Sequence, residues 1–430
     1  MLSALTLQIF FILIVLVLFL PRKYVLFPFI VSILFIPTDQ AIIISGCNFY
    51  VIQLLSLVAV IRHFIRGEVL SIKWNAYDKL LFAWAVTGAV LYSLLWGMEG
   101  VVYKSGRLLE LLGMYWVFRQ NITTCRDMTF ALKLIILISF VLLPFVMYEQ
   151  ATATNLFYHL GRVRTAIREG RLRCSASFSH PILFGSFGAS MFPIAWGMLK
   201  QSQNKIYIVG MCIFLYYVIA SASSGPILSL ASAVGFLLFF KFRKYSRNLI
   251  WWLLGISLLL QIVMKSPVWY IIAKINIVGG STGWHRANLI DKFVRHFQEW
   301  ALLGVQNVEH WGVHAGDVTN QFILEGVRGG LAGMVLYIIL IFMSLRILKR
   351  ASISARLKNE QWLYWGFCVS LVSDCVSFMS VSYFGQMSVY LTFKFAIISM
   401  LYGLSRQEAP LLTDQKKTFR NGNKMPSLLI

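Results

Sequence analysis

Charged residues are scarce in this sequence, and their scarcity excludes a soluble globular protein. Only 13% of its 430 residues are Asp, Glu, Lys or Arg, whereas 58% are hydrophobic. Soluble domains carry about 25% charged and about 45–50% apolar residues. Since a helix that crosses a bilayer needs about 20 apolar residues, the apolar residues suffice for about a dozen crossings. We therefore expect a membrane protein with little chain left for a separate soluble domain.

Cysteine pairs and the common nucleotide and metal motifs are also lacking. The six cysteines form no C-x-x-C pair, so neither a disulfide framework nor a zinc site is indicated. The absence of G-x-x-x-x-G-K-[ST] and of H-E-x-x-H argues against ATP-driven transport and zinc-dependent hydrolysis. No Asp-x-Asp pair is present to hold a divalent metal against a nucleotide sugar. We expect neither a metal nor a cofactor.

Long apolar runs predict an all-α polytopic membrane protein with about 12–13 transmembrane helices. Residues 1–404 form one membrane domain in this interpretation, and residues 405–430 form a basic cytoplasmic tail. The first run lacks a basic n-region and a cleavage site, so we expect it to be retained. The candidate spans lie near residues 4–20, 24–45, 48–62, 79–98, 101–118, 127–147, 178–199, 205–222, 225–240, 249–264, 320–343, 361–382 and 386–403.

Basic residues in the short loops predict the orientation, because Lys and Arg near span ends favour the cytoplasm. They gather in residues 22–23, 62–73, 119–126, 200–205, 241–247 and 346–358. These segments alternate with the candidate spans and therefore fall on one face of the membrane. We expect the C-terminus on that cytoplasmic face and the N-terminus outside.

Two long basic loops, residues 148–177 and 265–319, then fall on the outer face. Their cations are Arg162, Arg164, Arg168, Arg171 and Arg173 in the first, and Lys265, Lys274, Arg286, Lys292 and Arg295 in the second. Long external segments escape the charge rule, so a solvated basic loop is one interpretation. The other is an anion site, because guanidinium groups make bidentate, charge-assisted hydrogen bonds to phosphate.

The segment 283–300 predicts an amphipathic helix at the outer membrane surface. Its apolar side carries Leu289, Ile290, Phe293, Phe297 and Trp300, and its opposite side carries Asp291, Lys292, Arg295 and Glu299. Arg286 projects from the middle of the apolar stripe, where an unpaired cation is costly unless it meets an anion. Arg286 is thus the first candidate ligand residue, with a structural partner or snorkelling as the alternative.

Titratable residues also gather directly before the span at 320–343. They are Glu309, His310, His314 and Asp317, followed by Asn320. Such a glycine-bracketed loop at a membrane entrance suits a general base, and it equally suits an ordinary polar turn. The two histidines have no clear third ligand, so they are only weak evidence for a metal site.

Two further segments place polar groups at the outer face. His180 and Pro181 stand at the start of a span rich in small residues, where free backbone N–H groups attract anions and Pro is tolerated. His180 is either a substrate-binding residue or a simple helix cap. Residues 221–226 form a polar turn between two spans, and such breaks persist where they line a cavity.

Charges inside the spans have simpler interpretations. Arg107 with Glu110, and Glu325 with Arg328, are pairs at i,i+3 that would neutralise each other. Asp374 has no neighbouring cation in the sequence. It is therefore either a functional residue or an acceptor of hydrogen bonds from nearby serine hydroxyls.

Four segments of this sequence, taken in order, resemble segments of the bacterial O-antigen ligase and O-antigen polymerase-like membrane proteins. The matching pieces are residues 171–181, 223–226, 285–290 and 317–331, which lie in order across roughly residues 160–345. The ligase branch carries His-Asn at the start of the span after the large external loop. Here the pair is Thr319-Asn320, with Gly330 downstream. This departure favours a polymerase, or another glycan transferase, over a lipopolysaccharide ligase.

The resemblance implies a GT-C-like helical bundle in the bacterial inner membrane, with an active site facing the periplasm. It implies transfer or polymerisation of a polyprenyl-diphosphate-linked oligosaccharide of O-antigen, capsule or exopolysaccharide onto a glycan or lipid-glycan acceptor. The implied substrate-binding residues are Arg286, Arg173, Arg171, Asn320 and His180, and the implied catalytic residues are His314, Asp317 and His310. A flippase and a chain-length regulator are the implied protein partners, and no nucleic acid is expected.

Two rival functions remain open from the sequence. A flippase or transporter of lipid-linked oligosaccharide would also bind a diphosphate, but it predicts repeated helix bundles and charges in a central cavity. A membrane O-acyltransferase would use a histidine within the membrane, whereas the histidines noted above lie at the outer edge of the spans.

Overall fold

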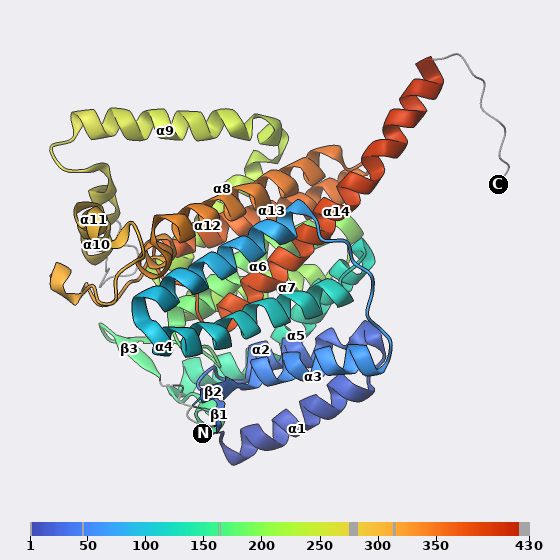
Figure 1. Ribbon diagram of the computed structural model, residues 1–430, viewed down its shortest axis with the longest axis horizontal. Helices are drawn as coiled ribbons and strands as arrows, with labels where there is room; N and C mark the ends of the chain where they lie inside the picture. The colour runs from blue at the N-terminus through green and yellow to red at the C-terminus, as the bar shows by residue number, and fades with distance from the viewer. Residues whose placement is uncertain are drawn as a thin grey trace.

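The computed structural model describes residues 2–44, 47–161, 163, 165–274, 283–312 and 315–420. The chain is mostly helical, and its long helices run side by side along one common direction (Figure 1). The α-helices are α1 (Ala4–Phe19), α2 (Leu26–Phe35), α3 (Val51–Ile65), α4 (Ala76–Asn121), α5 (Cys125–Thr152), α6 (Pro181–Ser202), α7 (Ile206–Ala220), α8 (Ser224–Leu238), α9 (Ser246–Val263), α10 (Gly283–Arg295), α11 (Phe297–Trp300), α12 (Gln321–Ser354), α13 (Lys358–Phe378) and α14 (Gln386–Arg420).

Short elements connect these helices. The 3-10 helices are η1 (Arg22–Tyr24), η2 (Leu156–His159), η3 (Phe239–Tyr245), η4 (Val268–Lys274) and η5 (Glu309–Trp311). The strands are β1 (Ala41–Ile44), β2 (Cys47–Tyr50), β3 (Ala166–Arg168) and β4 (Arg171–Arg173). They form two antiparallel hairpins, β1–β2 and β3–β4. The all-α prediction therefore holds for the bundle but missed both hairpins.

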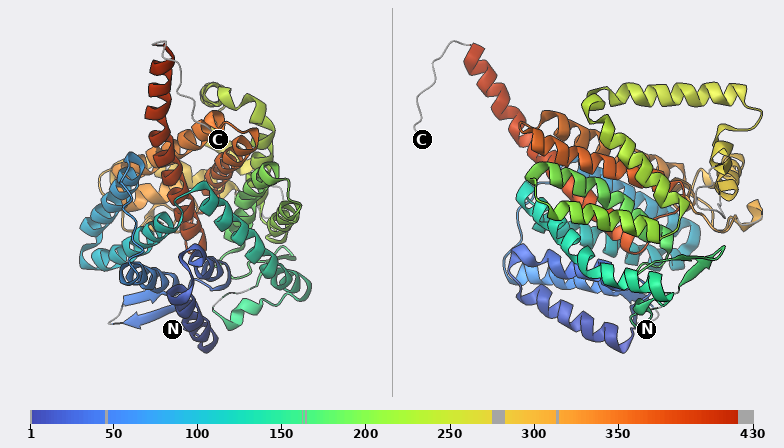
Figure 2. Two further views of the ribbon diagram at one scale, coloured as in Figure 1. Left: turned by 90° about the vertical axis from the view of Figure 1, so that its right-hand side faces the viewer. Right: turned by 180° about the vertical axis from the view of Figure 1, so that it is seen from behind.

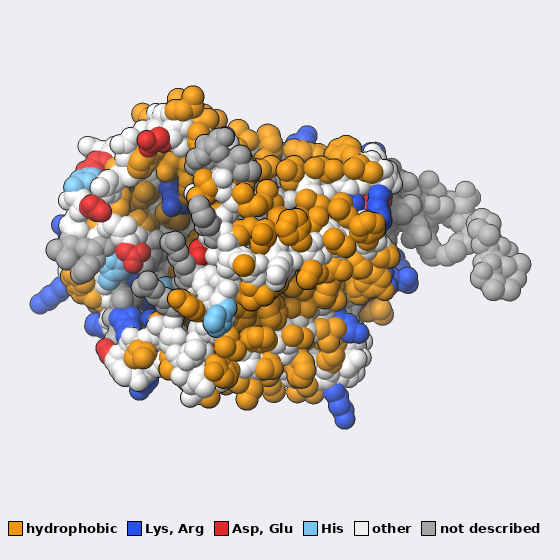
Figure 3. Space-filling view, turned by 90° about the horizontal axis from the view of Figure 1, so that it is seen from below, with side chains coloured by type: hydrophobic (Ala, Val, Ile, Leu, Met, Phe, Trp, Pro, Cys, Tyr) orange, Lys and Arg blue, Asp and Glu red, His pale blue; other side chains and the backbone are white. Residues whose placement is uncertain are grey.

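Six helices in the described part of the chain are long and apolar enough to cross a membrane. They are α4, α5, α6, α12, α8 continued through η3, and α14 as far as Arg406. The second half of α9 and η4, bent by 87°, would make a seventh span if the pair counts as one. Hydrophobic side chains cover most of the face shown in Figure 3 between two ends where charged side chains gather. By helix length and composition, the chain is a multi-pass membrane protein.

The difference between six or seven helices and the 12–13 predicted spans has structural causes. The predicted spans 79–98 and 101–118 both lie in α4, whose backbone leaves helical geometry at Gly97 (φ 62°, ψ −141°). The rings of Tyr92 and Tyr103 lie 5.5 Å apart, so the helix folds back on itself as a hairpin. Three other predicted spans correspond to α1, α3 and α7, which are apolar but have fewer than 18 residues.

The predicted span at 24–45 is wrong as a continuous helix. Its helix α2 ends at Phe35, just before Pro37, which has no N–H to continue a helix and disfavours helical geometry in the residue before it. Four of the remaining residues, Ala41–Ile44, form strand β1, which pairs with β2 from Ala41↔Tyr50 to Ile44↔Cys47.

The two ends of the bundle differ in composition. One end, called the loop end below, carries both hairpins, η4, η5, α10 and α11, and α14 extends beyond the other end (Figures 1 and 2). Hydrogen bonds join the basic connections at that other end: Arg62 donates to Leu20 O, Arg243 to Ser352 O and Lys349 to Lys244 O. The basic loops that the sequence places on one face thus lie together. Which end faces the cytoplasm stays a prediction.

Helix α6 lies at the centre of the bundle, where small residues allow close packing as the sequence predicts. A Cβ at Gly188 would lie 2.7 Å from Phe214 O of α7, and one at Gly366 would lie 2.4 Å from Pro193 O. Small residues at such positions are typical of helix contacts in membranes. Helix α9, in contrast, lies beside the bundle rather than within it (Figures 1 and 2).

The charges inside the bundle pair differently from the sequence expectation. Arg107 and Glu110 form the predicted ion pair at 2.7 Å. Glu325 instead accepts hydrogen bonds from Trp84 (3.0 Å) and Gln321 (2.7 Å), and no ion pair joins it to Arg328 in the described chain.

Asp374 does have a cation, contrary to the sequence expectation. Lys394 of α14 lies 2.5 Å from its carboxylate, and both side chains are 0% exposed. The cation is twenty residues away in the sequence and comes from the next helix, so only the packing of α13 against α14 reveals the pair.

Candidate functional site

Arginines from the two long predicted loops meet at the loop end of the bundle. The hairpin β3–β4 supplies Arg168, Arg171 and Arg173, and helix α10 supplies Arg286. The beginnings of α6, α8 and α12 lie at the same end. We refer to Arg168, Arg173 and Arg286 as the arginine cluster.

The hairpin positions its arginines through its turn and register. Glu169 and Gly170 both have positive φ (50° and 72°), as in the tight turns that suit the twist of paired strands. The register pairs Ala166 with Arg173 and Arg168 with Arg171. Arg171 therefore lies beside the turn and is exposed, whereas Arg173, at the base of the hairpin, is only 9% exposed.

Arg173 is held against the outer turn between α7 and α8. Its Nη2 donates to Ser223 Oγ at 2.7 Å, and that hydroxyl donates to Ser221 O at 2.7 Å. Its Nε is buried and makes no hydrogen bond with any described residue. Burial, reinforced by the charge of Arg168, lowers the pKa of Arg173. A guanidinium has five N–H donors, so most of the donors of Arg173 are left for another group.

Arg286 is the least compensated member of the arginine cluster. It is half-buried, and its Nε is shielded from solvent without a hydrogen-bond partner in the described part of the chain. Burial and the charges of Arg168 and Arg173 lower the pKa of Arg286 to about 10. None of the ion pairs among the described residues involves these three arginines. The geometry thus gathers positive charge that forms no ion pair with any described residue.

His180 caps α6 beside this cluster. Its Nδ1 accepts the N–H of Ile182 at 3.1 Å, so the capping role expected as an alternative is present. Burial and the charge of Arg173 lower the pKa of His180 to about 4, and Asp317 partly opposes them. His180 is therefore neutral near pH 7, and because Nδ1 is an acceptor, the ring proton lies on Nε2.

Helix N-termini add to the positive potential at the loop end. Helix α8 begins at Ser224, directly after Ser223, and α6 begins at Pro181. The first N–H groups of a helix carry partial positive charge. These termini and the arginine cluster together favour an anion.

Asp317 and Asn320 approach the site from the segment before α12. Asp317 is exposed; its backbone carbonyl accepts the N–H of Thr319 at 3.0 Å and lies 3.3 Å from His285 Nε2. Asn320 is buried and caps α12, accepting the N–H groups of Phe322 and Ile323 at 2.9 and 3.3 Å. The structure thus gives Asn320 a structural task that the sequence did not predict.

One other predicted catalytic residue, His310, lies apart from the arginine cluster. His310 is exposed and lies 2.7 Å from Glu299, which also accepts a hydrogen bond from Trp311 at 2.8 Å. No interaction among the described residues joins His310 to Arg286 or Arg173. His314 lies outside the described residues.

The predicted amphipathic helix is interrupted, and two of its residues differ in exposure from the prediction. Helix α10 ends at Arg295 and α11 starts at Phe297, so the helical phase is lost between them. Phe297, expected on the apolar side, is 46% exposed, whereas Asp291, expected on the solvated side, is 8% exposed and pairs with Arg295 at 2.8 Å. Leu289, Phe293 and Trp300 are buried as predicted.

One positioning residue escaped the sequence analysis. Glu149 of α5 accepts the backbone N–H groups of Ser175 and Ala176 at 3.1 and 2.9 Å and a hydrogen bond from Asn155 at 3.0 Å. It thereby anchors the segment between Arg173 and His180. A carboxylate just past the end of the predicted span 127–147 was the only available signal.

The types of side chain at the site limit the chemistry that it can perform. Among the residues that the structure describes, no group of three or more His, Cys, Asp or Glu side chains could hold a metal ion. No protein-family model matches the chain, and no curated protein matches it either. The resemblance to O-antigen ligases and polymerases therefore stays a prediction.

Proposed function

We propose that the chain is a glycosyltransferase at the outer face of the bacterial inner membrane. It would polymerise or transfer polyprenyl-diphosphate-linked oligosaccharide, with polymerisation favoured over ligation to the lipid A core. The observation that carries the proposal is the arginine cluster, whose buried Nε atoms on Arg173 and Arg286 have no partner in the described chain. Gathering such cations without a counter-charge is unfavourable, and a bound diphosphate offsets that cost.

The proposal includes a GT-C-like bundle of about 12–13 spans. The two arms of α4, the other five long helices and the shorter apolar helices α1, α3 and α7 account for ten of these spans. It also includes a periplasmic loop end, supported by the basic connections that gather at the opposite end.

The arrangement suits a displacement at the anomeric carbon. The acceptor hydroxyl oxygen forms a bond to that carbon, the bond from the carbon to the diphosphate oxygen breaks, and the lipid diphosphate leaves with the electron pair. Arg286 and Arg173 stabilise the developing negative charge, and Arg171 and Arg168 assist from the hairpin. The hydroxyl proton passes to a base.

Asp317 is the described residue best suited to be that base. It is exposed, and it lies near enough to His180 to influence its pKa. His310 is less suited, because Glu299 engages it away from the arginine cluster. His314 stays a candidate from its place in the sequence. His180, neutral near pH 7, would donate from Nε2 to the substrate.

A transfer assay with purified protein tests the proposal. With polyprenyl-diphosphate oligosaccharide as donor, we expect release of free lipid diphosphate and a lengthened or transferred glycan. Arg286→Ala should lower the rate about 100-fold or more, as the loss of a charge-stabilising donor does elsewhere. Arg286→Lys should also be poor, because a point charge lacks the bidentate geometry.

Arg295→Ala is the matched control, since Arg295 lies on the same helix but pairs with Asp291 and is exposed. It should transfer at the wild-type rate. Full activity of Arg286→Ala would remove the arginine cluster from the site. Movement of the donor from one leaflet of a vesicle membrane to the other, without release of lipid diphosphate, would instead indicate a flippase. Consumption of an acyl donor would indicate an O-acyltransferase.

A further inference from the structure

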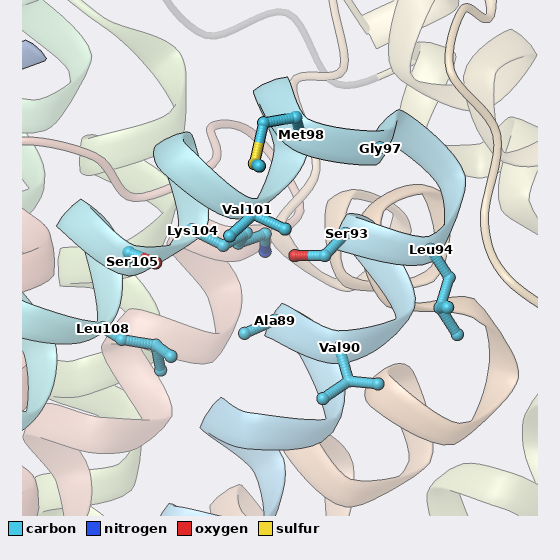
Figure 4. Close-up of a pocket in the computed structure, with 10 residues that line it drawn as sticks. All are labelled: Ala89, Val90, Ser93, Leu94, Gly97, Met98, Val101, Lys104, Ser105 and Leu108. Atoms are coloured by element: carbon cyan, nitrogen blue, oxygen red, sulfur yellow. The ribbon is translucent and has the colours of Figure 1, made fainter.

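The hairpin of α4 encloses a groove that is separate from the arginine cluster. Figure 4 shows its two arms, joined at Gly97, with Lys104 between them. The groove is lined by α4 alone, through Ala89, Val90, Ser93, Leu94, Gly97, Met98, Val101, Lys104, Ser105 and Leu108. The groove is thus apolar, with one cationic side chain, that of Lys104, along it.

Lys104 has no ion-pair partner in the described part of the chain. Its amine lies over the ring of Tyr92, 4.7 Å from the centroid. The charged groups that act on it are Glu325, Arg328 and Arg107. Whether Lys104 already has a counter-charge therefore depends on these three residues.

The nearby charges leave a surplus of positive charge. Arg107 is neutralised by Glu110 at 2.7 Å, whereas Arg328 has no ion pair among the described residues. The carboxylate of Glu325 is already engaged by the neutral donors of Trp84 and Gln321. Two cations, Lys104 and Arg328, therefore share one carboxylate that pairs with neither.

The groove lies on the part of the bundle that faces lipid most openly. In the most apolar window of α4, only 17% of the residues are buried, against 33% to 78% in the other five long helices. Leu94 and Met98 are 67% and 77% exposed. Lys104 lies seven residues from the turn at Gly97, or about 10 Å along a helix axis.

We propose that the α4 groove binds an anionic phospholipid of the surrounding membrane. Its phosphate lies at Lys104, and one acyl chain lies along Val90, Leu94 and Val101. Basic pockets between transmembrane helices bind anionic headgroups in this way, because the charge is neutralised where water is scarce. The site is independent of the proposed glycan transfer.

Lipid retention by the purified full-length protein tests this proposal. After delipidation in detergent, phosphatidylglycerol or phosphatidylcholine is added and the bound lipid is counted by native mass spectrometry. We expect the wild-type protein to retain phosphatidylglycerol in preference to phosphatidylcholine. Lys104→Gln should weaken phosphatidylglycerol binding about 10-fold or more, since it removes a charge-assisted contact.

Two further variants keep the outcome decisive. Val101→Trp fills the groove without changing charge and should also abolish retention, whereas Lys133→Gln, at an exposed lysine of α5, should bind like wild type. Equal retention of both lipids, or unchanged binding by Lys104→Gln, would overturn the proposal. Displacement of phosphatidylglycerol by an equimolar polyprenyl phosphate would assign the groove to the donor lipid instead. None of these readouts requires glycan transfer, so they fail or succeed separately from it.

Discussion

Two positive regions of this protein differ in whether other described residues compensate their charge. Lys394, inside the bundle, places its amine against Ser190 Oγ, Ser370 Oγ at 2.6 Å and the Asp374 carboxylate at 2.5 Å. An ammonium has three N–H donors, so all of them are used. Tyr383 donates to the other carboxylate oxygen at 3.0 Å.

The arginine cluster at the loop end has no such compensation. Among the described residues, Arg173 makes one hydrogen bond, to a hydroxyl, and Arg286 makes none and is repelled by the other arginines. Both regions pay for removing charge from water. The bundle offsets that cost within the chain, whereas at the loop end the proposed function assigns that task to a ligand. Substitutions should therefore act on folding in the first region and on binding in the second.

The largest expected effect comes from breaking the compensated pair. Lys394→Met leaves the Asp374 carboxylate buried and uncompensated, which typically lowers the free energy of unfolding by about 3–5 kcal/mol. The double variant Lys394→Met/Asp374→Leu should recover most of that loss, because neither charge remains. Unfolding in a detergent mixture of increasing sodium dodecyl sulfate measures both.

The exposed Lys133 of α5 offers a matched control, and Lys133→Met should unfold like wild type. A Lys394→Met protein as stable as wild type would show that the pair contributes nothing to folding. The double variant being as unstable as the single one would point to the serine contacts rather than the carboxylate.

The uncompensated cluster should respond to an anion. Pyrophosphate, a soluble equivalent of the lipid diphosphate headgroup, should stabilise the wild-type protein by about 2.7 kcal/mol at a hundred times its Kd. Arg286→Gln should lose this stabilisation, and its unfolding free energy without pyrophosphate should not fall, because the substitution removes repulsion from Arg168 and Arg173. Thermal unfolding with and without pyrophosphate measures both quantities. Equal stabilisation of Arg286→Gln and wild type would place the anion elsewhere.

The helical bundle could be predicted from sequence because long apolar runs are a local property. The break at Gly97 could also be anticipated, since the predicted spans end and restart there. The end of α2 could be anticipated from Pro37, Asp39 and Gln40, which the predicted span 24–45 passed over, whereas the hairpin β1–β2 could not be, because residues 41–44 are as apolar as a helix. Hydropathy measures burial in lipid, and it does not distinguish a helix from a strand at the membrane border.

The candidate site was predictable in its residue types but not in its pairing. Arg286 stood out because it interrupts an apolar stripe, and the structure places it beside Arg173 from a loop more than a hundred residues earlier. The pair of Asp374 with Lys394 and the anchoring by Glu149 depend on how distant segments pack. Sequence spacing along one helix reveals only partners at i,i+3 or i,i+4, as it did for Arg107 with Glu110.

The smallest expected effect tests whether His180 belongs electrostatically to the arginine cluster. Its pKa of about 4 in the folded protein lies below its ordinary value of 6.5, so between these values the unfolded chain binds more protons than the folded one. The stability that neutral His180 contributes is therefore complete above about pH 6.5 and is lost as the pH falls toward 4.

His180→Asn should flatten this dependence while keeping the α6 cap, because Asn also accepts the N–H of Ile182. The slope of unfolding free energy against pH should decrease by at most about 1.4 kcal/mol per pH unit, and by less than that because the ring is only half-buried. At pH 7.5 the two proteins should unfold alike. Arg173→Gln should produce part of the same flattening, since it removes one of the two causes that lower the pKa. Identical slopes in all three proteins would mean that His180 titrates as it does in the unfolded chain and that the charge of Arg173 does not reach it.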